Sequence, residues 1–494
     1  LGWSSRDEGG RWQPAYAVPL PSGGVFSIPD TQRGIEAQRS QVVLVDVSVP
    51  ESAPAGSYSG SIAVEADGAG KVALPVRLDV FDFALPDECR FRVELNAYAV
   101  PGPLLDYQRL VHDHRLTFNP WRLEPKVSGR GKAAVVEWKD YDRLAGPLLS
   151  GEAFRGSRRA GVPLPCMYLP FADDWPCPLT RETYAYPGRW PGRGEGRDAI
   201  DEHYASAPYL GDGLSPEYKE TFLAVEEQFV AHFRERGWTR TEMQCFFGGK
   251  ATHRIEFGAN RWWTTDEPYH WPDWLACQFF GGLWCEGRRA AGADPARWAV
   301  RFDISRPMWQ GRVLDGIADV VYYGGFAGAR AYRRCRDLAR DTGVRVMTYG
   351  SVSRTGASNV DCATMLADIW LHGGDGALPW QTLGNDGSLD RNENVDGAAL
   401  LVPGGRFRRP VVADLRVKAL REGEELGEYL AILADRRYLS REQIAAAIAK
   451  VAPTHAERAA GASADDADAL RFGGWKAWQL VELKRAIAER IEGR

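Results

Sequence analysis

The chain has 494 residues, of which 44% are hydrophobic, 26% charged and 11% aromatic, and its formal net charge at pH 7 is −5. That length predicts two or three domains with a large core. The near balance of 61 basic against 66 acidic residues argues against a nucleic-acid partner, and the absence of a long apolar run argues against a membrane span.

The first 88 residues have the pattern of β structure. We expect strands over residues 42–49, 58–64 and 72–83, separated by turns rich in proline and glycine. Short strands of this kind at this spacing are typical of two packed antiparallel sheets. Residues 1–88 are therefore predicted to form a β-sandwich domain.

From residue 89 the pattern changes to repeated units of strand, loop and helix. Apolar, β-prone runs lie at 92–98, 115–119, 162–169, 242–247, 299–304, 320–323, 344–348 and 376–381, and another strand is expected to end at Asp266 and Glu267. The repetition predicts a catalytic (β/α)8 barrel over 89–411, whose chemistry lies at the C-terminal ends of the strands. Residues 412–494 have helical periodicity and are predicted to form a C-terminal helical segment. The expected fold class is thus multidomain α/β.

The polar stretch 172–214 is too long for a plain connection between a strand and a helix. It is rich in glycine, proline, tryptophan and arginine, so we expect it to be an insertion that shapes the active site. Its arginines (Arg181, Arg189, Arg193 and Arg197) either keep the loop soluble or recognise an acidic substituent of a ligand.

The most informative motif is Trp-Trp-Thr-Thr-Asp-Glu-Pro-Tyr-His-Trp at 262–271, in which two adjacent carboxylates lie among aromatic residues. Aromatic faces pack against sugar rings, and two carboxyl groups in different environments can divide proton transfer and charge stabilisation between them. Pro268 disfavours helical backbone angles at Glu267, which predicts a strand that runs into a loop. The motif indicates a carbohydrate-cleaving site, although Asp-Glu-Pro is also a common loop sequence.

The order of parts resembles glycoside hydrolase family 123 and related uncharacterised glycoside hydrolase-like proteins. The resemblance rests on Val-Pro-x-x-Ala-Pro-Ala-Gly-x-Tyr-x-Gly at 49–60, Phe-Asp-Phe-Ala-Leu-Pro at 81–86, Thr-Asp-Glu-Pro at 265–268, Leu-Pro-Trp-Gln at 378–381 and the segment 413–423. It implies retaining, substrate-assisted hydrolysis of a terminal β-linked N-acetylhexosamine, most specifically N-acetylgalactosamine. Asp266 would then orient the acetamido group, and Glu267 would donate the proton, with a pKa raised by burial and by the charge of Asp266.

Further candidate residues lie at the ends of other predicted strands. Tyr322 and Tyr323 are candidates for binding the acetamido carbonyl, and strand alternation places one of the two in the core. Trp380 either forms the floor under the sugar ring or packs in the interior. The candidates for binding hydroxyl groups are Asn96, Asn119 and Tyr349, and those for outer subsites are Trp309 and Trp175.

Two other functions fit the same residues. One is a two-carboxylate glycosidase acting on a sugar without an acetamido group, with Glu267 as the acid and Glu94, Asp303 or Asp375 as its partner. The other is a carbohydrate-binding barrel without catalysis, which the fold alone does not distinguish from an enzyme. In every case we expect a glycan ligand, no cofactor and no metal. A chain that begins at Leu1 without methionine further suggests a secreted or periplasmic protein whose signal peptide is out of view.

Overall fold

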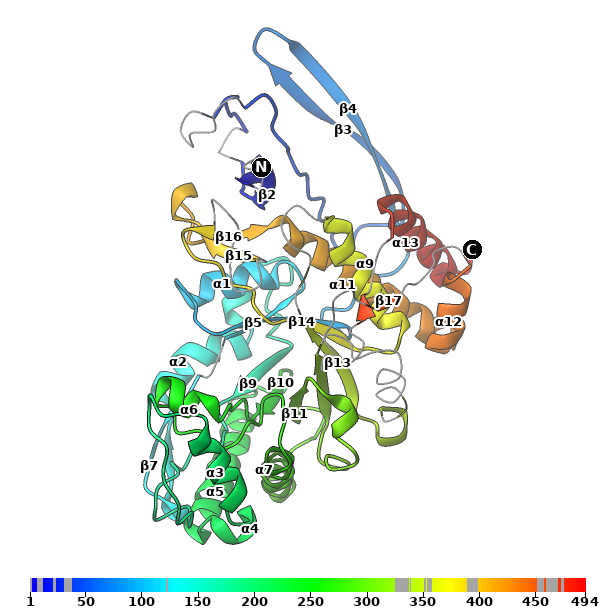
Figure 1. Ribbon diagram of the computed structural model, residues 1–494. Helices are drawn as coiled ribbons and strands as arrows, with labels where there is room; N and C mark the ends of the chain where they lie inside the picture. Colours follow the sequence, from blue (N-terminus) through cyan, green and yellow to red (C-terminus); the bar gives the residue numbers. More distant parts are fainter. Residues whose placement is uncertain are drawn as a thin grey trace.

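A computed structural model describes residues 2–6, 12–20, 24–30, 38–120, 123–324, 337, 339–350, 352, 358–388, 399–450, 457–458, 470–471 and 475–494. Eight strands form the centre of the molecule (Figure 1). In chain order they are β5 (Arg92–Ala97), β6 (Thr117–Pro120), β9 (Cys166–Leu169), β10 (Glu242–Phe246), β11 (Trp298–Ile304), β12 (Val320–Gly324), β13 (Arg345–Gly350) and β14 (Gly376–Pro379).

The eight strands form a parallel sheet that curls into a barrel. Strands β9 to β14 each pair in parallel with the next along the chain, β14 pairs back with β5, and β5 pairs with β6. Among the described residues no ladder joins β6 to β9, but Asn119 Nδ2 lies 3.5 Å from Cys166 Sγ across that gap. The predicted (β/α)8 barrel within a mixed α/β fold is thus confirmed.

Helices surround the barrel because both faces of its strands are buried. They are α1 (Leu104–His112), α2 (Trp138–Leu149), α5 (Pro216–Glu235), α7 (Trp271–Ala290) and α9 (Asn359–Leu371). The local sequence sets their ends: the Ser215 side chain accepts a hydrogen bond from Tyr218 N at the start of α5, and Pro216 occupies the first helical position. The helix expected over 327–341 lies largely outside the described residues.

Helix α11 (Leu415–Arg437) also belongs to this outer layer, although the sequence placed it in a separate C-terminal segment. A Cβ atom added at Gly427 would lie 2.7 Å from the ring of Phe91, and one at Gly423 would lie 2.6 Å from the carbonyl of Ala363. The two glycines therefore let α11 pack directly on the barrel and on α9. The remaining C-terminal helices are α12 (Arg441–Ile448) and α13 (Ala477–Glu492), accompanied by the short pair β17 (Glu457–Arg458) and β18 (Leu470–Arg471).

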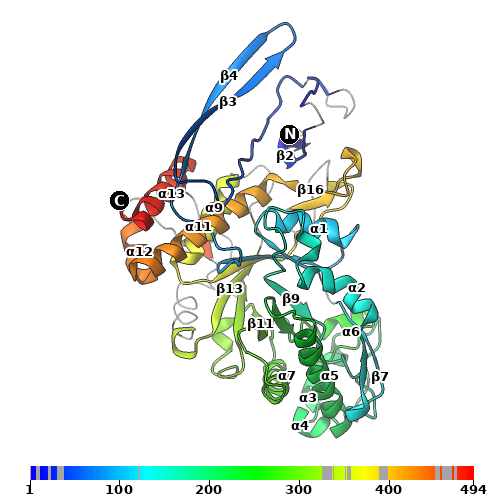
Figure 2. The ribbon, with the colours of Figure 1, turned by 180° about the vertical axis from the view of Figure 1, so that it is seen from behind.

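The N-terminal part is antiparallel, as predicted, but its strands belong to two separate sheets. β1 (Gly2–Arg6) and β2 (Trp12–Ala17) join β16 (Val411–Asp414) and β15 (Leu401–Pro403), whereas β3 (Gly56–Ala66) and β4 (Gly70–Val80) form a hairpin that projects from the molecule in both views (Figures 1 and 2). Hydrophobic side chains of the hairpin are exposed, with Val64 at 51% and Leu74 at 50%. The face-to-face packing of a β-sandwich is therefore not present among the described residues.

The strand predicted at 42–49 is also wrong, because this segment forms no ladder within the described residues. An isolated β-prone run has no partner for its backbone groups and stays irregular. Smaller elements lie beside the barrel: β7 (Lys126–Ser128), β8 (Val135–Glu137), α3 (Asp198–Ser206), α4 (Leu210–Gly213) and α6 (Thr252–Phe257). None of the helices in the described ranges combines the length and apolarity needed to cross a membrane.

Candidate active site

Asp266 and Glu267 lie at the C-terminal end of the barrel, but on a loop and not on the predicted strand. The loop runs from α6 to α7, and Asp266 N donates to Gly249 O at 3.0 Å while Glu267 N donates to Asp303 O at 2.9 Å. Gly249 follows β10, and Asp303 lies near the end of β11. Two backbone hydrogen bonds thus attach the loop near the ends of β10 and β11. They do not continue into a ladder, so the segment is not a further strand of the barrel.

Side chains of the same motif hold this loop in place. Thr265 Oγ1 accepts a hydrogen bond from Gly249 N at 3.0 Å, and Asp273 in the first turn of α7 accepts from Thr264 N at 2.9 Å. Trp262 and Trp263 are only 1% and 2% exposed, because they pack in the core between the loop and the helices. These two tryptophans therefore anchor the carboxylates and do not form the sugar-binding surface that the sequence suggested.

Glu267 has a left-handed backbone, with φ of 62°, which is unusual for a residue with a side chain. Such a conformation costs about 1–3 kcal/mol and is concentrated at functional sites. Its consequence here is geometric: two adjacent side chains, which would point to opposite faces of a strand, both reach the same cation. Lys250 Nζ lies 2.7 Å from Glu267 Oε2 and 3.7 Å from Asp266 Oδ2.

The two carboxyl groups differ in acidity. Burial raises the pKa of Asp266 to about 7, with Lys250 opposing the rise and the charges of Asp303 and Glu267 adding to it. Burial also disfavours the ionised form of Glu267, but the adjacent Lys250 ammonium and a hydrogen bond from Tyr349 outweigh it and lower the pKa. The expected raised pKa of Glu267 is therefore wrong, because sequence reasoning did not place Lys250 beside it.

Tyr349, a sequence candidate, is part of this site. Its hydroxyl donates a hydrogen bond to Glu267 Oε1, and burial raises the pKa of the phenol well above its usual value. The ring fits because the neighbouring β12 ends in a glycine: a Cβ atom at Gly324 would lie 2.5 Å from the Tyr349 hydroxyl oxygen. Tyr349 thus contacts the catalytic candidate itself, beyond the expected role of binding a sugar hydroxyl.

A third carboxylate lies next to the pair. Asp303 is buried, and Arg301 Nε and Nη2 each donate to one of its oxygens at 2.7 Å. Arg301 is fully buried in the barrel, with its guanidinium 3.7 Å from the ring centre of Tyr322. Burial raises the pKa of Asp303, against the lowering effect of Arg301.

Both tyrosines of β12 are occupied by other contacts. Tyr322 points into the barrel, where its hydroxyl donates to Glu94 Oε1 at 2.7 Å. Tyr323 points outward to the helices, where its hydroxyl donates to Gln310 Oε1 at 3.0 Å. Strand alternation therefore separates them as predicted.

The two asparagine candidates lie inside the barrel. Asn96 Oδ1 accepts a hydrogen bond from the Tyr168 hydroxyl at 3.2 Å, and Asn119 Nδ2 donates to Glu94 Oε2 at 3.1 Å. Both side chains are at most 4% exposed. They support the polar interior beneath the carboxylates.

The three tryptophan candidates differ in how far they are buried. Trp380 is half-buried; it packs against the apolar cluster inside the barrel, and its ring centre lies 6.3 Å from that of Tyr98. Trp309 is 44% exposed and lies 5.3 Å, between ring centres, from Tyr269. Trp175 packs against Phe171 in the core at 5.0 Å, so it is not an outer subsite.

Only one of the three alternative acids adjoins the pair. Glu94 lies in the middle of the barrel, where Arg301 Nη1 is 3.6 Å from Glu94 Oε2. Asp375 precedes β14 at the opposite end of the barrel and forms an ion pair with Arg441 at 2.7 Å. Asp303 is therefore the single partner among these for a two-carboxylate site.

A cavity of about 390 Å³ opens beside Glu267. The insertion supplies one wall, as its composition predicted. The lining residues are Arg197, Ile200, Asp201, Tyr204, Lys250, Ala251, Thr252, Thr264, Glu267, Tyr269, His270 and Arg306. Sequence reasoning did not identify Lys250 and Arg306 as site residues. Their positions could have marked them, because Lys250 follows β10 and Arg306 follows β11 within a few residues.

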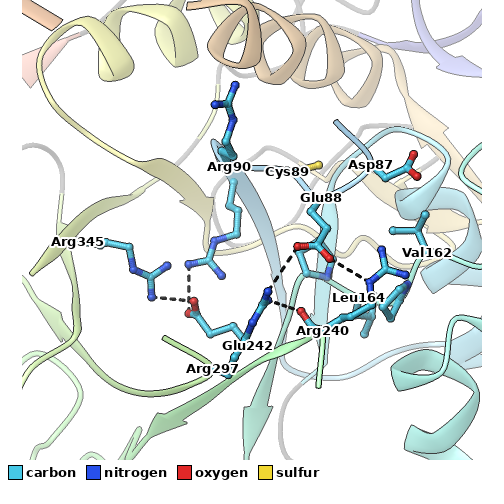
Figure 3. A pocket seen from close by; sticks show the side chains of 13 residues that line it. Asp87, Glu88, Cys89, Arg90, Val162, Leu164, Arg240, Glu242, Arg297 and Arg345 are labelled. Carbon is cyan, nitrogen blue, oxygen red and sulfur yellow. Dashed lines mark hydrogen bonds and ion pairs between the residues drawn. The ribbon is translucent and has the colours of Figure 1, made fainter. Parts of the chain in front are cut away.

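A second cavity, of about 290 Å³, lies at the opposite, N-terminal end of the barrel (Figure 3). Arg92 and Arg345 pair with Glu242 at 3.1 and 2.8 Å, and Arg240 and Arg297 pair with Glu88 at 3.0 and 3.5 Å. These ion pairs join the starts of several strands, which is a stabilising arrangement at this face of a barrel.

Among the described residues no group of three His, Cys, Asp or Glu side chains is arranged to bind a metal ion. His112 Nε2 and His114 Nδ1 instead each lie within hydrogen-bonding distance of a backbone carbonyl, at 3.0 and 2.7 Å.

Comparisons with known proteins add two solved structures. No family model matches the chain, and no curated protein matches it. A family 123 glycoside hydrolase from Clostridium perfringens, described in a study of glycolipid glycan hydrolysis, has a TM-score of 0.49 and 12% identity over 90% of this chain and 76% of its own. A family 138 glycoside hydrolase that targets pectin rhamnogalacturonan II has a TM-score of 0.31 and 12% identity over 75% of this chain and 43% of its own. The first of these belongs to the family that the sequence motifs resemble.

Proposed function

We propose that this protein is a glycoside hydrolase whose catalytic pair is Asp266 and Glu267. The observation that carries the proposal is the left-handed backbone of Glu267, which turns two adjacent carboxyl groups toward one cation beside a cavity. Their environments push the two pKa values in opposite directions. Glycoside cleavage uses one protonated and one ionised carboxyl group, and the opposite pKa shifts supply both.

The proposed roles follow from these environments. Asp266, with a pKa of about 7, keeps its proton at mildly acidic pH and donates it to the glycosidic oxygen as the bond to C1 breaks. Glu267 stays ionised and stabilises the positive charge that develops at C1. This assignment reverses the roles that the family resemblance implies.

The finer proposal is that the substrate is a terminal β-linked N-acetylhexosamine, most specifically N-acetylgalactosamine. In that case the acetamido oxygen attacks C1, and Glu267 orients the acetamido N–H and balances the charge of the oxazolinium intermediate. Water then opens the intermediate, with the ionised Asp266 taking its proton. Support for the acetamido sugar is the adjacent Asp-Glu pair itself, because substrate assistance leaves the enzyme without need of a separate nucleophile.

The second candidate function is a two-carboxylate glycosidase, favoured by one observation. Asp303 lies beside the pair, and its carbonyl holds the Glu267 amide. Aryl β-glycosides with and without a 2-acetamido group decide between the two reactions. Cleavage of the acetamido substrates alone, with inhibition by a thiazoline mimic of the intermediate, is expected; cleavage of plain glycosides without thiazoline inhibition would favour Asp303. Binding of sugars without cleavage of any substrate would leave the barrel a carbohydrate-binding protein.

A further inference from the structure

We propose that the cavity beside Glu267 recognises an oxyanion on the glycan, either a uronic carboxylate or a sulfate ester. The inference rests on the proposed function for the glycan nature of the ligand and adds its charge. Arg306, which follows β11, is the residue that would bind the oxyanion.

The guanidinium of Arg306 acts on Glu267 from a distance, and its charge contributes to the lowered pKa of that carboxyl group. No carboxylate of the described residues lies within ion-pair distance of it, and its one hydrogen bond is from Nη1 to Ser305 Oγ at 3.0 Å. Arg306 Nε is buried and has no acceptor among the described residues. A desolvated N–H donor without an acceptor is costly, so a ligand oxygen at this position would satisfy it.

Two aromatic rings hold Arg306 in place. Its guanidinium carbon lies 4.7 Å from the ring centre of Tyr269 and 5.4 Å from that of Trp309. The stacking restrains the side chain, which lines the cavity. A planar donor fork held in this way matches the two oxygens of a carboxylate or sulfate.

The charges around the cavity favour an anion over a neutral sugar. Arg197, Lys250 and Arg306 face two carboxylates, Asp201 and Glu267, and the Lys250 ammonium is already paired with Glu267. Arg197 forms no ion pair with a described residue. In the cavity at the N-terminal end of the barrel, by contrast, arginines are paired with Glu88 and Glu242. The arginines without an ion pair to a described residue, Arg197 and Arg306, line the cavity beside Glu267.

The experiment compares anionic glycosides with their neutral parents, using the wild-type chain for cleavage and its Glu267→Gln variant for binding. Calorimetry with Glu267→Gln measures binding of a uronic acid glycoside, a sulfated glycoside and their neutral parents at two salt concentrations. We expect one anionic ligand to bind at least about 10-fold more tightly than its neutral parent, with an advantage that shrinks in salt. If the uronic acid glycoside gains affinity over its neutral parent, the site binds a carboxylate; if the sulfated glycoside does, the site binds a sulfate ester.

Variants then assign the effect to Arg306. Arg306→Gln should remove the anionic preference, so that the charged ligand loses much more affinity than its neutral parent. Arg312→Gln is the matched control, because Arg312 lies on the same loop, is 90% exposed and is outside the cavity. Equal binding of charged and neutral ligands, or an unchanged preference in Arg306→Gln, would overturn the inference.

The outcomes also separate this inference from the proposed function. Anionic preference in binding, without cleavage of any glycoside by the wild type, would overturn the enzyme and keep the oxyanion site. Cleavage of neutral and anionic glycosides with equal kcat/KM, together with equal binding, would keep the enzyme and remove the oxyanion site.

Discussion

Lys250 Nζ forms a 2.7 Å ion pair with Glu267 Oε2, and this contact sets the charge state of the site. The ammonium also lies 3.7 Å from Asp266 and lowers the pKa of both carboxyl groups. Because Asp266 is more deeply buried, its pKa stays high while that of Glu267 falls. The unequal burial of the two carboxyl groups, together with the closer contact of Lys250 with Glu267, thus separates two chemically similar neighbours.

Lys250→Met should move the activity profile toward higher pH. Removing the cation takes away a charge that favours ionised carboxylates, so both pKa values rise. The acid limb of kcat/KM, which reports Glu267, and the alkaline limb, which reports Asp266, should both shift upward. The measurement is the pH dependence of kcat/KM, with the exposed Lys139→Met on α2 as control. An unmoved profile would mean that Lys250 does not act on the pair.

Asp266→Asn should lower kcat for an unactivated glycoside by about 10²–10⁴-fold, the usual contribution of general acid catalysis. Substrates with a good leaving group should lose less, because they need no proton. In the wild type, kcat/KM should fall as the pH rises above about 7, where Asp266 loses its proton. Comparing the two substrates in both proteins checks the role. If Glu267→Gln instead shows the leaving-group dependence, the roles are those implied by the family resemblance.

Asp266→Asn should also stabilise the fold at alkaline pH. A carboxyl group whose folded pKa is raised from 3.8 to about 7 favours folding while protonated, and that advantage is lost as the pH rises through this window. The amide has no such loss, so the gain in Tm over wild type should be larger at pH 8 than at pH 5.

The control for this stability effect is Asp79→Asn. Hydrogen bonds from Ser57 and Arg77 lower the pKa of Asp79 below 3.8, so its contribution is present at both pH 5 and pH 8 and is lost only in stronger acid. Its effect on Tm should therefore be the same at pH 5 and pH 8. An equal effect of Asp266→Asn at both values would contradict the raised pKa.

Gly324→Ala should reduce activity through Tyr349. The added methyl group would lie 2.5 Å from the tyrosine hydroxyl and push the ring away from Glu267. Loss of a hydrogen bond to a charged group corresponds to about 1.5–3 kcal/mol, or roughly 10–100-fold in kcat/KM. Tyr349→Phe should give a similar loss. The control is Gly350→Ala, where no atom lies within 4 Å of the new methyl group, and an equal loss there would point to a general disturbance.

Gly427→Ala should destabilise the barrel, because the new methyl group would meet the ring of Phe91 at 2.7 Å. Overpacking of this kind costs about 1–3 kcal/mol. Gly282→Ala on α7 is the matched control, since nothing lies within 4 Å of its new methyl group and alanine favours the helix. Urea unfolding followed by near-UV circular dichroism measures both. A neutral Gly427→Ala would mean that α11 is not docked as described.

The sequence by itself determined the elements whose signal is local. The eight β-prone runs of the barrel were predicted within a few residues, because strand propensity depends on neighbours along the chain. The Asp266-Glu267 motif was likewise visible in the sequence. The surplus strands at 42–49 and 262–267 show the limit: a β-prone run becomes a strand only when another backbone is beside it.

Only the tertiary structure decided the chemistry of the site. The pKa order of Asp266 and Glu267 depends on Lys250 from another loop, on Tyr349 from β13 and on the unequal burial of the two carboxyl groups. These groups are 17 and 82 positions from Glu267, and no local pattern brings them together. Charge interactions act through space over a few ångströms, so they follow the folded barrel and not the order of residues along the chain.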